Sequence, residues 1–210
     1  MSVLNPAILY EPERGKATVD IVFVHGLGGD ALKTWTRESC CWPRDLLKDD
    51  FPDARIMTWG YDSSVAKLQE PSSQTSIFDH AESLLNSVSR ARDGLNKKER
   101  PIIFVCHSLG GLVTKQALIR ASEYLHNNQD HRLGAIFTYT TGVIFMGTPH
   151  RGSDKTPLGH IAAAVAKVML RQPSRKLLKI LEKDSDILEH QRRSFDSIKE
   201  QLFIVCLHCP

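Results

Sequence analysis

The sequence has no long hydrophobic run, and this absence excludes a simple membrane-spanning helix. No segment approaches the roughly 20 consecutive apolar residues that such a helix needs. The formal net charge is only +3 at pH 7, which is too small to favour nucleic acid as a partner. The first residues also carry neither the basic stretch nor the apolar stretch of a secretory signal. We therefore expect an intracellular protein that is not secreted.

Cysteine is present in a number that does not favour a disulfide framework. The chain has 5 cysteines, and an odd count leaves at least one unpaired. Cys206 and Cys209 have the Cys-x-x-Cys spacing, but neither a second ligand pair nor a thioredoxin-like context accompanies them. A reducing compartment fits best, and we expect no metal and no cofactor.

Apolar runs alternate with helical patterns along the chain, which predicts a mostly parallel sheet with helices on both faces, the α/β class. The predicted strands are residues 7–10, 19–24, 54–59, 102–106, 142–146 and 202–206. Predicted helices follow at 42–47, at about 77–95 after a loop at 71–73, and behind position 108; residues 158–200 are expected to form a cap-like helical insertion. Ser76 and Asp79 approximate a capping box for the second helix. We expect one domain over 1–210, with its core at about 17–207.

Residues 106–110 read Cys-His-Ser-Leu-Gly and lie between a predicted strand and a predicted helix. A serine at a sharp strand-to-helix turn is the nucleophile elbow of α/β-hydrolases. The residues flanking such a serine must be small because the turn is tight, and Gly110 satisfies this on the helix side. Cys106 replaces the first glycine of the usual Gly-x-Ser-x-Gly pattern. The alternative is that Ser108 only caps the helix.

A second glycine-rich segment, His25-Gly26-Leu27-Gly28-Gly29, directly follows the strand at 19–24. An oxyanion hole needs two converging backbone donors, one after the nucleophile and one from such an earlier loop. The N–H groups of Leu27 and Leu109 are the candidates. The alternatives are a plain linking turn or a phosphate loop, and the third glycine or Lys-Ser/Thr that the latter requires is missing.

A third segment, residues 142–153, is a strand that ends in Gly-Thr-Pro-His-Arg-Gly-Ser. The carboxyl ends of parallel strands gather at one edge of the sheet, and that edge hosts the site. The residues expected to line the pocket or its loops are His25, Gly26, Gly28, His107, Gly110, Thr148 and Pro149.

Together the three segments resemble the serine esterase, lipase-like branch of the α/β-hydrolase superfamily, and are most similar to the serine-active-site-containing proteins linked to phospholipid handling. The resemblance implies an acyl-serine intermediate, an ester or lipid substrate, and association with mitochondrial or endoplasmic reticulum membranes. In the family an acid follows the strand that matches 202–206, and a histidine follows one further strand. The resemblance therefore implies that this chain is C-terminally truncated, lacking the last strand and the catalytic-histidine loop. Similar domains also stand at the N-terminus of large repeat and nucleotide-binding proteins.

The serine needs a base, and a base needs an orienting carboxylate. His150 and His208 are the substitute candidates by position, and Asp154 is a candidate acid. His107 is adjacent to Ser108 but should point away from its hydroxyl, and His25 is expected to position the oxyanion loop.

Two functions therefore remain open: a serine hydrolase that acts on carboxylic or lipid esters, or a catalytically inactive binding or regulatory module of the same fold. The basic residues within 158–200 would suit a peripheral membrane contact or a solvated helix face. An unpaired last strand would invite a partner chain.

Overall fold

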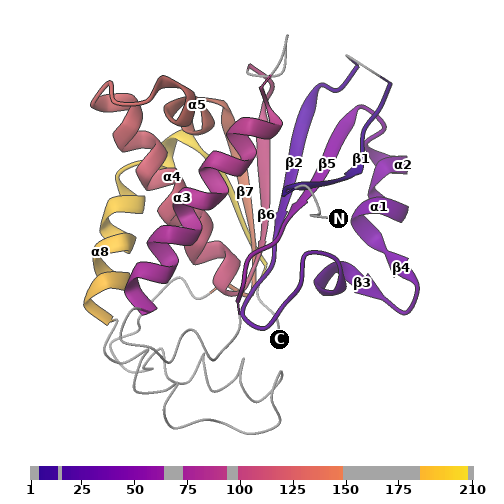
Figure 1. Ribbon diagram of the computed structural model, residues 1–210, viewed down its shortest axis with the longest axis horizontal. Helices are drawn as coiled ribbons and strands as arrows, with labels where there is room; N and C mark the ends of the chain where they lie inside the picture. The colour runs from indigo at the N-terminus through magenta and orange to yellow at the C-terminus, as the bar shows by residue number, and fades with distance from the viewer. Residues whose placement is uncertain (1–4, 14–15, 64–72, 94–98, 149–184, 208–210) are drawn as a thin grey trace, which may run out of the picture.

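The computed structural model describes residues 5–13, 16–63, 73–93, 99–148 and 185–207 (Figure 1). Their main feature is a six-stranded sheet in the order β1-β5-β2-β6-β7-β8. The strands are β1 (Ala7–Tyr10), β2 (Val19–Val24), β5 (Ala54–Trp59), β6 (Ile102–His107), β7 (Thr140–Met146) and β8 (Phe203–Leu207). Only the β1–β5 pairing is antiparallel among these strands. The predicted α/β class with a mostly parallel sheet is confirmed.

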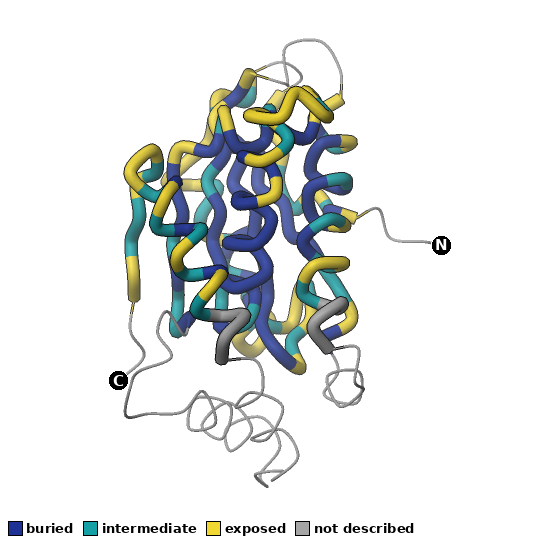
Figure 2. Tube along the Cα trace, turned by 90° about the vertical axis from the view of Figure 1, so that its left-hand side faces the viewer, coloured by how far each residue is buried: buried dark blue, intermediate teal, exposed yellow. Residues whose placement is uncertain are grey.

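The central strand β2 is buried on both sides, and this explains its unbroken apolar sequence. Val22 and Val24 belong to the larger core, whereas Ile21 and Phe23 belong to the smaller core on the opposite face. Successive side chains of a strand point to opposite faces, so both sets must be apolar. Residues 20–27, from β2 into the loop that follows it, are buried without a break, and Figure 2 shows buried chain through the centre of the molecule.

Helices cover the two faces of the sheet unequally (Figure 1). The larger core packs beneath the long helices α3 (Ser73–Ala91), α4 (Leu109–His126), α5 (His131–Tyr139) and α8 (Ser185–Asp196). The other face carries the short elements η1 (Lys33–Trp35), β3 (Thr36–Arg37), β4 (Cys40–Cys41), α1 (Trp42–Asp45) and α2 (Leu47–Asp50). There Trp35 and Trp42 pack edge-on against Phe23, with ring centroids 5.0 and 5.1 Å away.

Several predicted boundaries were wrong. Helix α3 already begins at Ser73, so position 73 is helical and the capping box expected at Ser76 and Asp79 would lie inside the helix. Helix α5 was missed: Asp130 caps it by accepting from the N–H groups of Arg132 and Leu133, but Gly134 within it weakens the helical pattern. The β3–β4 ribbon was also missed because each of its strands has only two residues.

Of the predicted insertion, residues 158–184 lie outside the described part of the chain. Its end forms α8 and the 3-10 turn η3 (Lys199–Gln201). Strand β8, which follows, is the last strand in the described order. Phe203 in it is 74% exposed; that a partner chain covers this edge stays a prediction. Within the described ranges, no helix combines the length and apolar character needed to cross a membrane.

Candidate active site

Ser108 occupies a strained turn between β6 and α4. Its backbone has φ 50° and ψ −122°, a conformation that residues with a Cβ rarely adopt. The residue stands at the N-cap position of α4, yet its side chain makes no capping hydrogen bond. The strain therefore is not offset by a cap. It is the geometry expected of a serine whose hydroxyl must be presented away from the helix.

The turn is fixed by neighbours that leave no room for larger residues. The Ser108 N–H donates to the Met146 carbonyl of β7 at 2.9 Å. A Cβ added to Gly110 would lie 2.3 Å from the carbonyl oxygen of His25 and 2.5 Å from that of Val24. Such contacts are with backbone and cannot be relieved by a rotamer change. Gly110 is therefore required by the close approach of β2 to the start of α4.

Cys106, which stands in place of the first glycine, is completely buried on the larger core side. Its thiol donates to Thr114 Oγ1 at 3.2 Å, and the Thr114 hydroxyl donates to the Gly110 carbonyl at 2.9 Å. Burial raises the pKa of the Cys106 thiol to about 12. The side chain is thus an unreactive packing element that ties the strand to the first turn of α4.

The loop after β2 lies directly against the elbow. A Cβ on Gly26 would be 2.8 Å from the Ser108 Cβ and 2.9 Å from the His107 carbonyl oxygen. Gly28 has φ 62° and its N–H donates to Ser63 O at 3.0 Å. Within the described residues, the N–H groups of Leu27 and Leu109 donate to no acceptor. These two amides are the pair that the sequence proposes for an oxyanion hole.

His25 is buried, and both of its ring nitrogens have partners. Nδ1 lies 2.9 Å from the Gly26 carbonyl oxygen, and Nε2 accepts from the Tyr61 N–H at 3.2 Å. The Tyr61 ring stacks on the imidazole at 4.5 Å, and its hydroxyl donates to the His25 carbonyl at 3.1 Å. Since Nε2 accepts, Nδ1 carries the proton. His25 is therefore neutral and holds the loop in place. Neither of its ring nitrogens is available to accept a proton from Ser108.

The polar groups around the elbow are kept uncharged. Burial lowers the pKa of His25, and burial together with neighbouring His25 lowers the pKa of His107. Burial likewise raises the pKa of the Tyr61 phenol. The His107 Nδ1 atom is buried without a hydrogen-bond partner in the described structure, and its ring lies edge-on to Trp35, 6.4 Å between centroids. The three groups named here, His25, His107 and Tyr61, therefore favour their neutral forms.

Thr148 is the last described residue of the third predicted segment. It follows Gly147, which has φ 59° and donates to Leu207 O at 2.9 Å. A Cβ on Gly111 would lie 2.2 Å from Thr148 Oγ1, so the Thr148 side chain packs directly against the first turn of α4. Its hydroxyl is buried and makes no hydrogen bond in the described structure. The carboxyl ends of β2, β6 and β7 thus converge, as the sequence predicts.

The candidate base and acid residues all lie outside the part of the chain that the structure describes. They are His150, Asp154 and His208, and Pro149 lies outside it too. Within the described ranges, no histidine makes a hydrogen bond to Ser108 Oγ. No group of three His, Cys, Asp or Glu side chains that could hold a metal ion occurs there either.

Sequence reasoning missed the roles of Tyr61 and Thr114. Both lie next to the segments that were singled out: Tyr61 follows the β5 strand by two positions, and Thr114 lies one and a half turns into α4. A tyrosine immediately after a parallel strand was a usable signal, because that end of the strand faces the site. No local signal pairs Thr114 with Cys106.

Comparison with known proteins agrees with this arrangement. Residues 17–187 match the family described as putative serine esterase (DUF676), and the chain belongs to that family. Bovine Protein SERAC1 is 32% identical over 196 residues, which are 84% of this chain and 27% of the bovine protein. The mouse protein of the same name is 33% identical over 153 residues, covering 64% of this chain and 22% of its own length. The chain thus spans about a quarter of the relatives that it matches.

Solved structures share the fold at lower sequence identity. Mature Bacillus licheniformis lipase BlEst2 has a TM-score of 0.56 at 21% identity, with 93% of this chain and 66% of the lipase covered. Phospholipase PlaB from Legionella pneumophila has a TM-score of 0.51 at 16% identity, with 91% and 39% covered. These likenesses establish an α/β-hydrolase fold.

Proposed function

We propose that this chain is a serine hydrolase that cleaves carboxylic or lipid esters through an acyl-serine intermediate. The observation that carries the proposal is the strained backbone of Ser108, which lies against the glycine loop after β2, where the Leu27 amide, like that of Leu109, donates to no acceptor in the described residues. Strain of this kind costs about 1–3 kcal/mol and persists only where the surrounding structure holds it. A plain helix cap would need neither the positive φ nor the glycine contacts.

In this mechanism Ser108 Oγ attacks the ester carbonyl carbon and forms an Oγ–C bond. The Oγ proton passes to a base, and the carbonyl oxygen becomes an anion that accepts hydrogen bonds from the Leu27 and Leu109 amides. Collapse breaks the bond to the alcohol oxygen, which takes the proton as it leaves. Water then attacks the acyl-serine by the same steps, which release the acid and restore Ser108.

We propose a base outside the described residues, because both ring nitrogens of His25 have partners and His107 makes no hydrogen bond to Ser108 Oγ among the described residues. We propose His150 or His208 for this role, with Asp154 as the orienting acid. An oxyanion hole and pocket without a base still give a rate on the order of a thousand-fold over water. Weak activity would therefore be compatible with the proposed site even if neither histidine is the base.

The test is covalent labelling with a fluorophosphonate probe, followed by hydrolysis of p-nitrophenyl esters of increasing acyl length. Wild type should be labelled at Ser108, and Ser108→Ala should lose both labelling and hydrolysis. Ser197→Ala is the matched control, because this exposed serine donates only to the nearby Ser194 carbonyl. His150→Ala and His208→Ala, assayed in parallel, identify the base by which of them slows labelling.

Labelling that persists in Ser108→Ala would remove the proposed nucleophile. A folded wild-type protein that is neither labelled nor active would overturn the hydrolase proposal in favour of a binding or regulatory module. The acyl-length series decides between short-chain esters and lipid-like esters, since a lipid-directed pocket should give kcat/KM values that rise with chain length.

A further inference from the structure

The helical layer holds a cavity that the proposed reaction does not use. It has a volume of about 520 Å³ and is lined by residues of α3, α4 and α8, with α4 packed against both other helices (Figure 1). Its α4 residues run from Gln116 to Tyr124. Gln116 already lies about 12 Å along the helix axis from Ser108. The cavity is therefore separate from the elbow, and its volume is in the range of pockets that bind small molecules.

Two buried glutamines in the cavity wall use only part of their hydrogen-bonding capacity. Gln116 and Gln191 are 8% and 5% exposed. Gln191 Nε2 donates to the Leu112 carbonyl at 3.1 Å and to Gln116 Oε1 at 3.2 Å. Among the described residues, Gln116 Nε2 donates to no acceptor and Gln191 Oε1 accepts from no donor. Neither atom is closed off by packing, so the cavity presents one free amide donor beside one free amide acceptor.

Carboxylates outnumber cations in the same wall. Asp79, Glu82 and Glu123 line the cavity together with a single arginine, Arg120, among the residues that the structure describes. Arg120 Nη1 donates to Glu123 Oε2 at 3.0 Å, and its Nε lies 3.9 Å from Glu82 Oε2. Asp79 is exposed and forms no ion pair within the described ranges. With histidine counted as neutral, the wall has an excess of negative charge.

The basic residues next to the cavity do not cancel this excess. Arg192 and Arg193 of α8 both pair with Glu189, and neither arginine lines the cavity. The Lys115 ammonium group lies over the Phe195 ring, 5.2 Å from its centroid, and Lys115 does not line the cavity either. A cation that enters the cavity would therefore meet carboxylates with capacity to spare.

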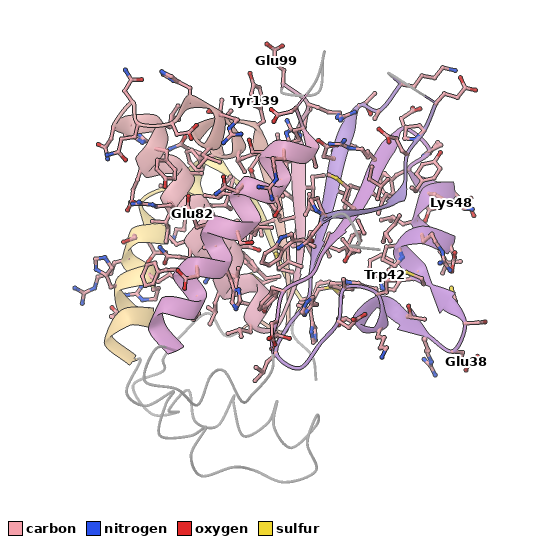
Figure 3. All side chains as sticks on the ribbon, in the orientation of Figure 1. Glu38, Trp42, Lys48, Glu82, Glu99 and Tyr139 are labelled. Atoms are coloured by element: carbon pink, nitrogen blue, oxygen red, sulfur yellow. The ribbon has the colours of Figure 1, made fainter. Side chains whose placement is uncertain are left out.

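Apolar and aromatic side chains complete the wall. Phe78, Ala81 and Ile119 line it, and Phe78 is 48% exposed. Glu82 reaches from α3 to α4, where the Tyr124 hydroxyl donates to its Oε1 at 3.0 Å (Figure 3). This bond holds the carboxylate in place at the cavity. An apolar surface, a fixed carboxylate and two free amide atoms thus face one space.

We propose that this cavity binds a small organic ammonium ion that has an apolar body and a hydroxyl or carbonyl oxygen. The ammonium group would donate to Glu82 and to Gln191 Oε1, with Asp79 adding attraction at the rim. The ligand oxygen would accept from Gln116 Nε2, and the apolar body would pack on Phe78. An excess of carboxylates alone would attract any cation. The free donor and acceptor in the same wall add the selection for a ligand with both kinds of polar group.

The test is isothermal titration of the full chain at pH 7 with phenylethanolamine, which has an ammonium group, a hydroxyl group and an aromatic body. Two matched ligands each lack one polar group. Phenylethanol has no ammonium group and should bind at least fivefold more weakly, because the wall carboxylates then attract no charge. Phenethylamine has no hydroxyl group and should bind about threefold more weakly, because Gln116 Nε2 then keeps no ligand acceptor.

Glu82→Gln places the charge recognition in this cavity. A glutamine can still accept from the Tyr124 hydroxyl, so the fold should be kept, while phenylethanolamine should bind about three- to fivefold more weakly. Asp79→Asn removes an exposed, unpaired charge and should weaken binding about twofold, which gives a second variant that does not endanger folding. Glu200→Gln is the control, since this exposed acid of η3 does not line the cavity. It should bind phenylethanolamine as wild type does.

Three results would overturn the site: no binding of phenylethanolamine at millimolar concentration, equal binding of phenylethanol, or equal affinities of Glu82→Gln, Asp79→Asn and Glu200→Gln. A fourth is phenylethanolamine that blocks fluorophosphonate labelling of Ser108 and whose affinity is unchanged in Glu82→Gln, because it would then bind at the elbow. The titrations need no catalytic activity. Failure of this site and failure of the proposed hydrolase function are therefore distinguishable.

Discussion

Polar groups are buried at both ends of strand β2, but they are compensated in opposite ways. At its amino end Asp20 is charged and surrounded by three arginines. At its carboxyl end His25 is neutral, and burial lowers its pKa while two backbone groups occupy its ring. At one end the buried groups are paired as ions, and at the other they are neutral and hydrogen-bonded. The second end carries the Leu27 amide, and close to it that of Leu109, and neither donates to an acceptor within the described residues.

This difference explains why the chemistry is expected at one end of the sheet only. A charged residue beside Ser108 would either compete for the oxyanion or need its own counter-ion. Fixed dipoles of neutral groups do neither, and in a dry site they stabilise a developing charge without rearranging.

The largest change in stability is expected when the Asp20 carboxylate, at the amino end of β2, is removed. Asp20→Asn keeps the shape of the side chain but removes the carboxylate that pairs with three buried guanidinium groups, which should cost about 3–5 kcal/mol of unfolding free energy. The measurement is urea unfolding at pH 7. Asp50→Asn, at an exposed position at the end of α2, is the control and should change stability by less than about 0.5 kcal/mol. Near-equal stability of the two variants would show that the carboxylate is not what holds the cluster.

The second-largest effect is expected when a methyl group is added at Gly110, which packs against the carboxyl end of β2. Gly110→Ala would place a methyl group 2.3 Å from His25 O and 2.5 Å from Val24 O, both on rigid backbone. We expect a loss of about 3 kcal/mol, the upper range for overpacking, and loss of fluorophosphonate labelling because the loop must move away from Ser108. Gly142→Ala is the matched control, since its nearest atom would be 3.4 Å away. If Gly110→Ala is as stable and reactive as Gly142→Ala, the loop does not lie against the elbow.

The neutral end should also give the protein a pH dependence of its own. Burial lowers the pKa of His25 below the usual histidine value of about 6.5, so the unfolded chain binds a proton more readily than the folded one. The stability from neutral His25 is therefore complete above pH 6.5 and is lost as the pH falls below it. The slope cannot exceed about 1.4 kcal/mol per pH unit for one group.

Urea midpoints at pH 7, 6 and 5 test this expectation. His25→Asn should be less stable than wild type at pH 7 but should lose less on acidification, because one buried titrating group is gone. His107 remains in that variant and keeps part of the slope, since burial lowers its pKa too. His190→Asn, at an exposed position on α8, should leave the slope unchanged. An identical slope in all three proteins would contradict the neutral, buried state of His25.

The sequence predicts the neutral end far better than the charged end, for a physical reason. Strand, glycine turn and helix are neighbours along the chain at Ser108, so their order alone indicates the elbow. Asp20 meets Arg55 and Arg92 from 35 and 72 residues away, and no local pattern records such pairings. The start of α3 was also misplaced, because Ser76 and Asp79 resemble a capping box while the helix already begins at Ser73.

The smallest effect concerns Cys106, where the chain departs from Gly-x-Ser-x-Gly. Cys106 does not have a positive φ, unlike Ser108, so glycine is not required there by conformation. Its side chain is buried and its thiol donates to Thr114 Oγ1. Cys106→Gly should therefore cost about 1–2 kcal/mol through a small cavity, a lost bond and added backbone entropy. Labelling of Ser108 should persist, because the turn itself is unchanged.

Cys106→Ala separates these contributions. It removes the thiol but adds no backbone freedom, so it should retain about 0.5–1 kcal/mol more stability than Cys106→Gly. Both values come from urea unfolding at pH 7, with fluorophosphonate labelling as the check on the elbow. Should Cys106→Gly be more stable than wild type, the cysteine strains the turn. The strain at Ser108 would then arise partly from its neighbour, and the contrast between the two ends of β2 would be weaker than the hydrogen bonds indicate.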